Sequence, residues 1–280
     1  MIQITEETFE QVLNIFIESS AIDLRNATFI DPYGMLGILE FGELLKFDGI
    51  KKTLFLPHSE EVLKYLERMD FFRFAERYFT LEPPEPSISE KYLRSSYSDV
   101  LLEITPIKDS DDIHFIVGKV KSRAETILAR HLHYDEKAIH GFIVSLSEVC
   151  QNIIEHSEKT GYVGIQKYHF QKFNKNVVKL AVMDIGIGFR RSLSGRFNIR
   201  NDIDAIEMAL LYGASRYTDV GRGHGLPGVR RFVNKWNGKL SIRSGIAKLS
   251  IIPKWAWGKE RESHLRYFPG AQINILLPEV

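Results

Sequence analysis

The stretch VVKLAVMDIGIGF, residues 177–189, decides the fold: an apolar run ends at Asp184 and passes directly into Gly186 and Gly188. Such a run, bounded by glycine, is typical of a buried strand. A carboxylate at a strand end accepts a hydrogen bond from an exocyclic amine such as that of adenine, and glycine lets a flat ring approach the backbone. The same residues also form a tight turn after a strand, so the motif alone leaves both interpretations open.

Upstream of this strand, residues 136–156 have the apolar spacing of an amphipathic helix. Glu148, Asn152 and His156 follow each other at intervals of four and therefore share one face beside the apolar stripe. A carboxylate and an amide one turn apart can polarise a water and give an oxygen ligand to Mg²⁺. A solvated helix edge is the alternative.

Downstream, GRGHGLPGVRRFV at 221–233 places four glycines just before an apolar-periodic helix. Backbone N–H groups at a helix start form an anion site suited to phosphates. The preceding ASRYTDV is a poor strand, which argues against a dinucleotide-binding G-x-G-x-x-G, and the absence of G-x-x-x-x-G-K-[ST] excludes a P-loop.

The order of elements predicts an α/β protein of two units. The proline-rich LEPPEPSIS at 81–89 marks the boundary, so we expect a small domain at 1–82, a linker at 83–97 and a larger domain at 98–280. In the larger domain, neighbouring strands close in sequence predict helices on one face of a mixed, largely antiparallel sheet. The predicted helices are 6–18, 33–47, 59–74, 111–132, 136–156, 202–213 and 227–236, and the predicted strands are 21–30, 52–57, 98–107, 161–170, 176–183, 239–243, 247–252 and 271–277.

Together, the three motifs resemble those of the GHKL ATPase superfamily of gyrase, the heat-shock chaperone, histidine kinases and MutL. EVCQNIIEH corresponds to its N box, DIGIG to its first glycine box and GRGHG to its second, and the N-box histidine is most similar to the anti-sigma-factor kinase branch. The resemblance covers about residues 98–280 and implies the Bergerat fold, with ATP and Mg²⁺ as ligands.

The resemblance also implies roles for individual residues. Asn152 would hold Mg²⁺, with Glu148 assisting through water and acting as general base, and Asp184 would read adenine. The remaining nucleotide-binding residues would be His156, Gly186, Gly188, Gly221, Arg222, Gly223, His224, Gly225 and Leu226.

Residues 189–220 correspond to the mobile lid of that family. The first part, FRRSLSGRFNIR, contains Arg190, Arg191, Arg196 and Arg200 and no acidic residue, so these side chains either meet phosphate or form a solvated basic loop. The family often has Gly-Thr near its final strand, with the hydroxyl supporting the aspartate. This chain has Gly270 and Ala271 there, which puts the details of adenine recognition in question.

The N-terminal unit resembles a STAS domain over about residues 1–80, through IDLRNATFIDPYGMLGILEFGELLK, KKTLFLP and SEEVLKYLERMDFF. Where phosphorylated members have a serine before the turn glycine, this chain has Tyr33 before Gly34, which argues against a serine switch. Tyr33 is either a phosphorylation site or, as we favour, a packed turn residue. The unit would serve as a built-in regulator or docking surface.

Composition sets limits on location and partners. The 37 basic and 36 acidic residues give a net charge of +1, which argues against nucleic acid as a partner. The acidic start and the lack of a long apolar run argue against secretion and a membrane span, so a cytoplasmic protein is expected. The single cysteine, Cys150, lies among apolar residues and is expected to be buried rather than reactive.

Two further groups have competing interpretations. His131, His133 and His140 could suggest zinc or a phospho-acceptor, but their spacing and the lack of cysteine favour surface histidines. Trp255 and Trp257 in a basic segment suggest a partner or single-strand stacking surface, with packing at a sheet edge as the favoured alternative.

The combined prediction is a cytoplasmic Mg-ATP-binding regulator that acts through contacts with a protein partner or with its own STAS-like unit, and homodimerisation is open. As an enzyme, it would hydrolyse ATP or phosphorylate a protein serine or threonine, with Glu148 assisting the attacking hydroxyl. As a binding switch, it would hold ATP without turnover and signal through the lid.

Overall fold

A computed structural model describes residues 2–84, 99–157, 159–171, 174–215 and 225–280. The C-terminal strands are β6 (Val100–Ile107), β7 (Gly161–Phe170), β8 (Lys175–Asp184), β9 (Lys239–Gly245), β10 (Ala247–Ile251), β11 (Arg261–Glu262) and β12 (Phe268–Pro278). The C-terminal helices are α6 (Ser110–Ala124), α7 (Arg130–Leu132), α8 (Glu136–Asn152), α9 (Gly188–Leu193), α10 (Asp202–Tyr212) and α11 (Gly225–Lys235), with π-helical segments η1 (Glu125–Ala129) and η2 (Ile153–Ser157). Most of the predicted linker lies outside the described residues.

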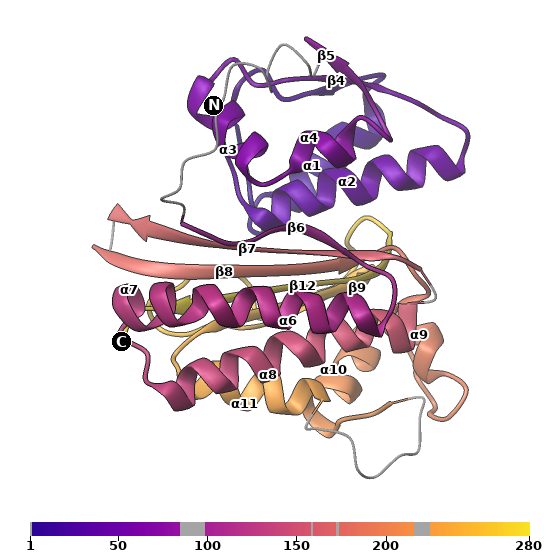
Figure 1. Ribbon diagram of the computed structural model, residues 1–280. Coiled ribbons are helices and arrows are strands. Elements are labelled where there is room, and N and C mark those ends of the chain that lie inside the picture. Colours follow the sequence, from indigo (N-terminus) through magenta and orange to yellow (C-terminus); the bar gives the residue numbers. More distant parts are fainter. Residues whose placement is uncertain (1, 85–98, 158, 172–173, 216–224) are drawn as a thin grey trace.

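These strands form one seven-stranded sheet in the order β11-β10-β9-β12-β8-β7-β6. Every neighbouring pair in it is antiparallel. Figure 1 shows α6, α8, α10 and α11 together on one face of the sheet, as an α/β sandwich requires. The predicted fold class, with helices on one face of a largely antiparallel sheet, is confirmed.

Side-chain caps and a glycine determine where α8 begins and where α10 begins and ends. Asp135 caps α8 by accepting from the Ala138 N–H at 2.7 Å, and Asn201 caps α10 by accepting from the Asp204 N–H at 2.9 Å. Gly213 ends α10 with a φ of 69°, a conformation that glycine adopts without strain. Buried side chains of α8 then pack on the sheet in a core that includes Leu146.

The N-terminal unit is a smaller α/β arrangement. Its strands are β1 (Ile2–Ile4), β2 (Ile22–Asp23), β3 (Ala27–Ile30), β4 (Thr53–Phe55) and β5 (Thr80–Glu82), and its helices are α1 (Phe9–Glu18), α2 (Pro32–Phe47), α3 (Glu60–Arg68) and α4 (Phe71–Ala75). The strands pair in parallel, as β1 with β3 and as β2-β4-β5. The STAS resemblance stays a prediction.

Two predicted elements of this unit are each divided in the structure. The strand expected at 21–30 is β2 and β3, which join different sheets. The helix expected at 59–74 is α3 and α4, because Asp70 between them adopts a left-handed conformation with a φ of 61°. Apolar periodicity continued across both breaks and therefore did not reveal them.

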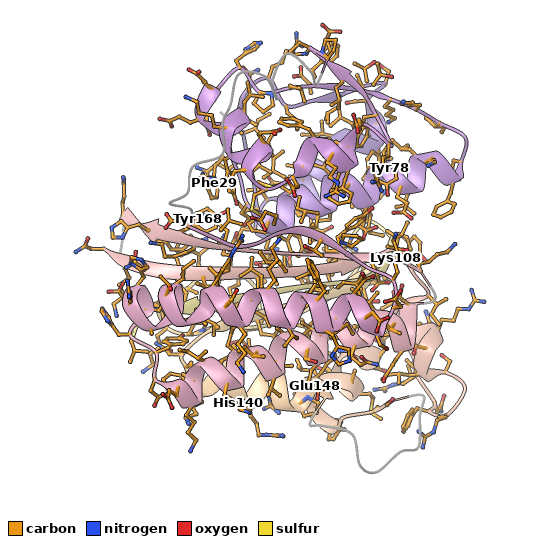
Figure 2. All side chains as sticks on the ribbon, in the orientation of Figure 1. Phe29, Tyr78, Lys108, His140, Glu148 and Tyr168 are labelled. Carbon is orange, nitrogen blue, oxygen red and sulfur yellow. The ribbon has the colours of Figure 1, made fainter. Side chains whose placement is uncertain are left out.

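The N-terminal unit covers the other face of the large sheet (Figure 1). Its helix α2 packs against β7 and β8, and one apolar cluster joins the unit to Tyr162, Met183 and Phe268 of the sheet. At one edge of the junction, the ring of Phe29 meets Tyr168 edge-on at 5.3 Å between centroids (Figure 2). The seven-stranded sheet is thus the middle layer of three.

Cys150, Tyr33 and the length and polarity of the helices can each be compared with the sequence prediction. Cys150 is fully buried, and burial raises the pKa of its thiol, as expected for an unreactive cysteine. Tyr33 is also buried, which agrees with a packed turn residue. Across the described part of the chain, every helix is too short or too polar to cross a bilayer.

Candidate functional site

The carboxyl group of Asp184 lies at the end of β8, facing the helix layer, and is only 4% exposed. Its Oδ1 accepts a hydrogen bond from the Gly186 N–H at 2.7 Å, and Ser157 and the Ala271 backbone also hydrogen-bond to it. Burial raises the pKa of Asp184 to about 6, against the effect of these three bonds. The carboxylate is therefore ionised at neutral pH and becomes protonated in mild acid.

Glycines let three backbone segments meet around Asp184. A Cβ on Gly186 would lie 1.9 Å from the Ser157 carbonyl oxygen, and one on Gly270 would lie 2.0 Å from the Asp184 carbonyl oxygen. Gly188 has a φ of 70° at the start of α9. The D-x-G-x-G motif is thus used for close backbone approach.

Asn152 reaches the same site from the last residue of α8. Its Nδ2 is buried and has no hydrogen-bond partner. A buried amide without a partner is costly, and amides in this state mark ligand sites when they face a cavity. The π-helical turn η2 that follows carries Ser157 under Asp184.

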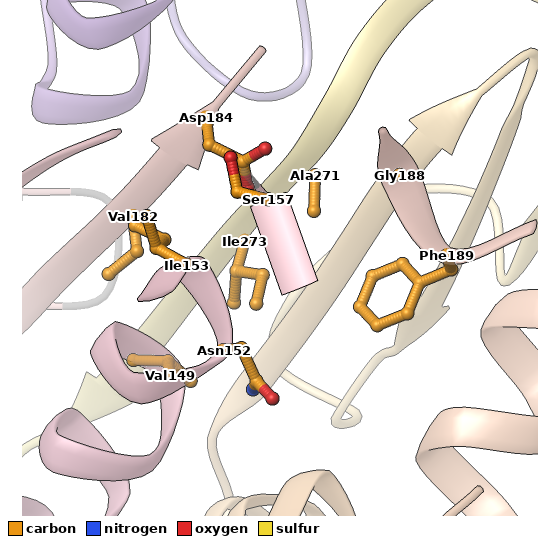
Figure 3. Close-up of a pocket in the computed structure, with 10 residues that line it drawn as sticks. All are labelled: Val149, Asn152, Ile153, Ser157, Val182, Asp184, Gly188, Phe189, Ala271 and Ile273. Carbon is orange, nitrogen blue, oxygen red and sulfur yellow. The ribbon is translucent and has the colours of Figure 1, made fainter. Parts of the chain in front are cut away.

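These side chains line one hollow between the helix layer and the sheet (Figure 3). Its volume is about 20 Å³, room for about one water molecule, so a larger ligand requires the lining side chains to move. Its walls are mainly apolar, with Asp184 at one end and Asn152 at another. The lining residues are Val149, Asn152, Ile153, Ser157, Val182, Asp184, Gly188, Phe189, Ala271 and Ile273.

The types of residue in this lining suit a purine and a phosphate-bound Mg²⁺, provided that the hollow widens to admit the ring. The Asp184 carboxylate is an acceptor for an exocyclic amine, the apolar walls suit a flat ring, and an amide such as that of Asn152 can supply an oxygen ligand after its side chain turns. The Phe189 ring faces this space in Figure 3, so its rotation would set the width of the slot.

The structure brings some of the predicted site residues together and leaves others apart. Asn152, Asp184 and Gly188 share the hollow, whereas Glu148 lies one helical turn before Asn152 and is not part of its lining. Figure 2 places Glu148 on the helix layer. Gly225 and Leu226 begin α11. The predicted residues Gly221, Arg222, Gly223 and His224 lie outside the described residues, as does the side chain of His156.

A second, larger hollow of about 980 Å³ opens on the other side of the glycine turn, sharing Ser157 and Gly188 with the first. Gly186 faces it, as do the cations Lys159, Arg190 and Arg191. The first two lid arginines thus lie beside the candidate adenine pocket rather than in it.

The other two lid arginines make contacts of a solvated basic loop. Arg200 pairs with Asp204 at 2.8 Å while 82% exposed, and Arg196 donates to the Ser215 carbonyl at 2.9 Å.

Comparison with known proteins adds little to this geometry. No protein-family model matches the chain, and no curated protein matches its sequence. Among solved structures, the chain is similar to the histidine kinase domain of the Erythrobacter litoralis EL346 blue-light activated histidine kinase. The two are 12% identical, the match covers 89% of this chain and 86% of that one, and the TM-score is 0.28. A likeness this weak assigns neither function nor ligand, which rest on the residues themselves.

Sequence reasoning missed Ser157 and Phe189. Ser157 follows EVCQNIIEH directly, and its side chain hydrogen-bonds to the Asp184 carboxylate from η2, whereas Ala271 has no hydroxyl to offer. A small hydroxyl residue at the end of the N-box helix was the available signal.

The remaining candidates lie elsewhere. His131, His133 and His140 are exposed, and the described residues contain no group of three or more His, Cys, Asp or Glu arranged to hold a metal. Trp255 donates its indole N–H to the Asn237 carbonyl at 2.6 Å, whereas Trp257 is 51% exposed. The Trp255 bond agrees with packing at the sheet edge.

Proposed function

We propose that this protein is a Mg-ATP-binding regulator of the GHKL type. The observation that carries the proposal is the hollow in which a buried carboxylate, that of Asp184, and the buried amide Nδ2 of Asn152, which has no hydrogen-bond partner, face one apolar slot. Asp184 would accept the exocyclic amine of adenine, and Asn152 would hold Mg²⁺ on the phosphates. The bound metal would neutralise phosphate charge.

As an enzyme, the protein would use Glu148 as a general base. Its position one turn before Asn152 on α8 would put it near the phosphates, outside the adenine slot. Glu148 would take the proton from a water or a protein serine or threonine hydroxyl as that oxygen bonds the γ-phosphorus and the bond to ADP breaks. As a binding switch, the protein would carry out no such step.

The regulator would work through protein contacts in the cytoplasm. Its own N-terminal unit is the first candidate partner, because that unit already covers the sheet that carries Asp184. A separate protein partner and a homodimer are further candidates, to be tested by measuring the solution mass with and without nucleotide.

Calorimetric titration of Mg-ATP into the wild type, Asp184→Asn and Asn152→Ala tests the binding proposal. We expect binding that weakens at least about tenfold in each variant, because each loses a charge-assisted or metal contact. Folded wild-type protein that does not bind Mg-ATP would contradict the proposal.

Phosphate release and phosphoryl transfer on the same samples separate the enzyme from the switch. Glu148→Ala should abolish turnover and keep binding if the protein is an enzyme, and Glu136→Ala, an exposed acid on the same helix, is the matched control. A wild type that binds Mg-ATP without turnover would support the binding switch and contradict the enzyme.

A further inference from the structure

Arg243 in β9 is fully buried at 0% exposure, yet its charge is fully paired by the N-terminal unit. Its Nε and Nη2 donate to the two carboxylate oxygens of Glu10 in α1, at 2.5 and 3.1 Å. Such a two-point contact fixes orientation as well as distance. The guanidinium is therefore held from one side by a helix of the other unit.

On its other side, Arg243 is linked to the candidate nucleotide site. Its Nη1 donates to Oε1 of Gln272 at 3.3 Å, and the two residues are direct cross-strand neighbours. The Nε2 of Gln272 donates to the Asp184 backbone carbonyl at 3.1 Å and to the Pro269 carbonyl at 2.8 Å. One side chain thus holds both the end of β8 and the turn before Ala271.

We infer that Glu10, Arg243 and Gln272 are positioning residues for Asp184, and that through them the N-terminal unit sets the nucleotide affinity of the site. This inference rests on the proposed function. The Asp184 carboxylate projects from the backbone that Gln272 holds, so a shift of that carbonyl re-aims the carboxylate. Because Gly270 touches the same carbonyl, both walls of the slot would move together.

The coupling has a reciprocal consequence. If the docked N-terminal unit raises nucleotide affinity, then nucleotide must strengthen the docking of α1 by the same factor. Nucleotide in the slot would thus be sensed on the opposite face of the sheet, without any contact between the ligand and the N-terminal unit.

A second ion pair of the same interface supplies a matched control. Glu7 accepts a hydrogen bond from the Lys239 ammonium group at 3.0 Å; it lies three residues before Glu10, and Lys239 is on the same strand as Arg243. The exposed fractions of the two acids are 25% for Glu7 and 21% for Glu10, and those of the two cations are 2% for Lys239 and 0% for Arg243. Among the described hydrogen bonds, Lys239 donates to Glu6 and Glu7 and has no link to Asp184.

The experiment is a titration of Mg-ATP into the full-length wild type, Glu10→Gln, Glu7→Gln and Gln272→Leu, with the unfolding midpoint of each recorded. We expect binding about tenfold weaker for Glu10→Gln and Gln272→Leu, and within about twofold of wild type for Glu7→Gln. The double variant Glu10→Gln/Gln272→Leu should bind no more weakly than Gln272→Leu alone, because both changes break one chain of contacts.

The outcomes separate the two ideas. If the wild type binds Mg-ATP and Glu10→Gln and Glu7→Gln bind it equally well, the positioning role is overturned and ATP binding stays intact. The same follows if the losses of binding free energy in the double variant are additive. A folded wild type without binding overturns the proposed function, and this inference falls with it. A loss of affinity in Glu10→Gln that exceeds that in Glu7→Gln at equal unfolding midpoints supports the positioning role, because general destabilisation would affect both.

Discussion

The two faces of the large sheet are both buried, but by different chemistry. The face toward the helix layer is apolar along β8, β9 and β12, with Leu180, Ile242 and Ile273 in one core. On the opposite face, β8, β9, β10 and β12 bury polar and charged side chains under the N-terminal unit. These are Lys179, Lys239, Ser241, Arg243, Lys248, Ser250, Gln272 and Asn274.

Acids of the N-terminal unit neutralise the cations of this opposite face. Asp31 pairs with Lys179 at 2.8 Å, Glu6 with Lys239 at 2.5 Å and Lys248 at 3.1 Å, and Glu10 with Arg243. Buried pairs contribute little net stability, because desolvation offsets attraction, but they penalise wrong docking strongly. The opposite face also contributes apolar burial, through Ala181, Met183 and Phe268, so the distinctive role of its ion pairs is to specify how the two units fit.

The largest effect is expected from breaking one buried pair of the charged face. Lys179→Met leaves Asp31 without its cation, and the loss should be about 3–5 kcal/mol of unfolding free energy. Adding Asp31→Asn should recover most of it, because asparagine keeps the 2.8 Å bond that caps α2 at Gly34. Urea unfolding measures both, with Lys175→Met on the exposed end of the same strand as the control. If Lys179→Met were as stable as Lys175→Met, the pair of Lys179 and Asp31 would contribute nothing to the free energy of unfolding.

On the helix-layer face, Asp184 should give stability and ligand binding opposite responses to pH. Its folded pKa of about 6 is above its ordinary value of 3.8, so the native state holds the proton more tightly. The contribution of Asp184 to stability is then greatest in acid and falls by on the order of 3 kcal/mol as pH rises from about 4 to 6. Binding needs the carboxylate, so affinity should fall about tenfold per pH unit below 6.

Adenosine is the suitable ligand for this measurement, because it lacks phosphates that titrate in the same range. Asp184→Asn should remove both responses, since its side chain does not ionise. Adenosine affinity that stays constant from pH 7 to 5 in the wild type would place the amine acceptor elsewhere.

The apolar face, and the position of Asp184 at the end of its strand, were largely predictable from sequence. The apolar run at 177–183 and the glycine pattern after Asp184 report backbone chemistry that is local in the chain. Lys179 interrupts this run and Arg243 lies in another predicted strand, but neither position carries information on what covers it. Their partners, Asp31 and Glu10, are far away in sequence, so only the fold reveals the pairing.

The contact of Ser157 with Asp184 was not predicted, for a related reason. Ala271 is next to Asp184 through strand pairing, and a motif comparison inspects that position alone. Ser157 reaches the same carboxylate from η2, a π-helical turn that the residue spacing did not predict.

A smaller effect is expected at Glu40, a buried acid of α2 for which the described residues provide no cation. Both oxygens of Glu40 lack hydrogen-bond partners, and burial, with Glu43 and Asp184 nearby, raises its pKa well above the ordinary value. Glu40→Met should therefore raise the unfolding free energy at pH 8 by about 1–3 kcal/mol. Glu43→Met is the matched control and should lose stability, since its carboxylate accepts from Tyr78 at 3.0 Å.

Glu40 also has a distinct pH signature. Wild-type stability should fall as pH rises above 4.5 toward the higher folded pKa of Glu40, because the unfolded acid ionises first. The unfolding free energy of Glu40→Met should therefore depend less steeply on pH across that range than that of the wild type. Equal slopes would show that the carboxyl finds a partner in solution.

The smallest effect concerns the hydroxyl that supports Asp184. Ser157→Ala removes one of three hydrogen bonds to the carboxylate and should weaken Mg-ATP binding by about 0.5–1.5 kcal/mol, measured by calorimetry. Ala271→Thr places a hydroxyl on the opposite wall of the slot, so it should change wild-type affinity little and restore much of the loss in Ser157→Ala. Rescue would mean that the slot needs one hydroxyl and accepts it from either wall. A double variant as weak as Ser157→Ala would instead tie the role of Ser157 to the bonds of its hydroxyl with Lys159, to whose carbonyl it donates at 3.3 Å and from whose N–H it accepts at 3.2 Å.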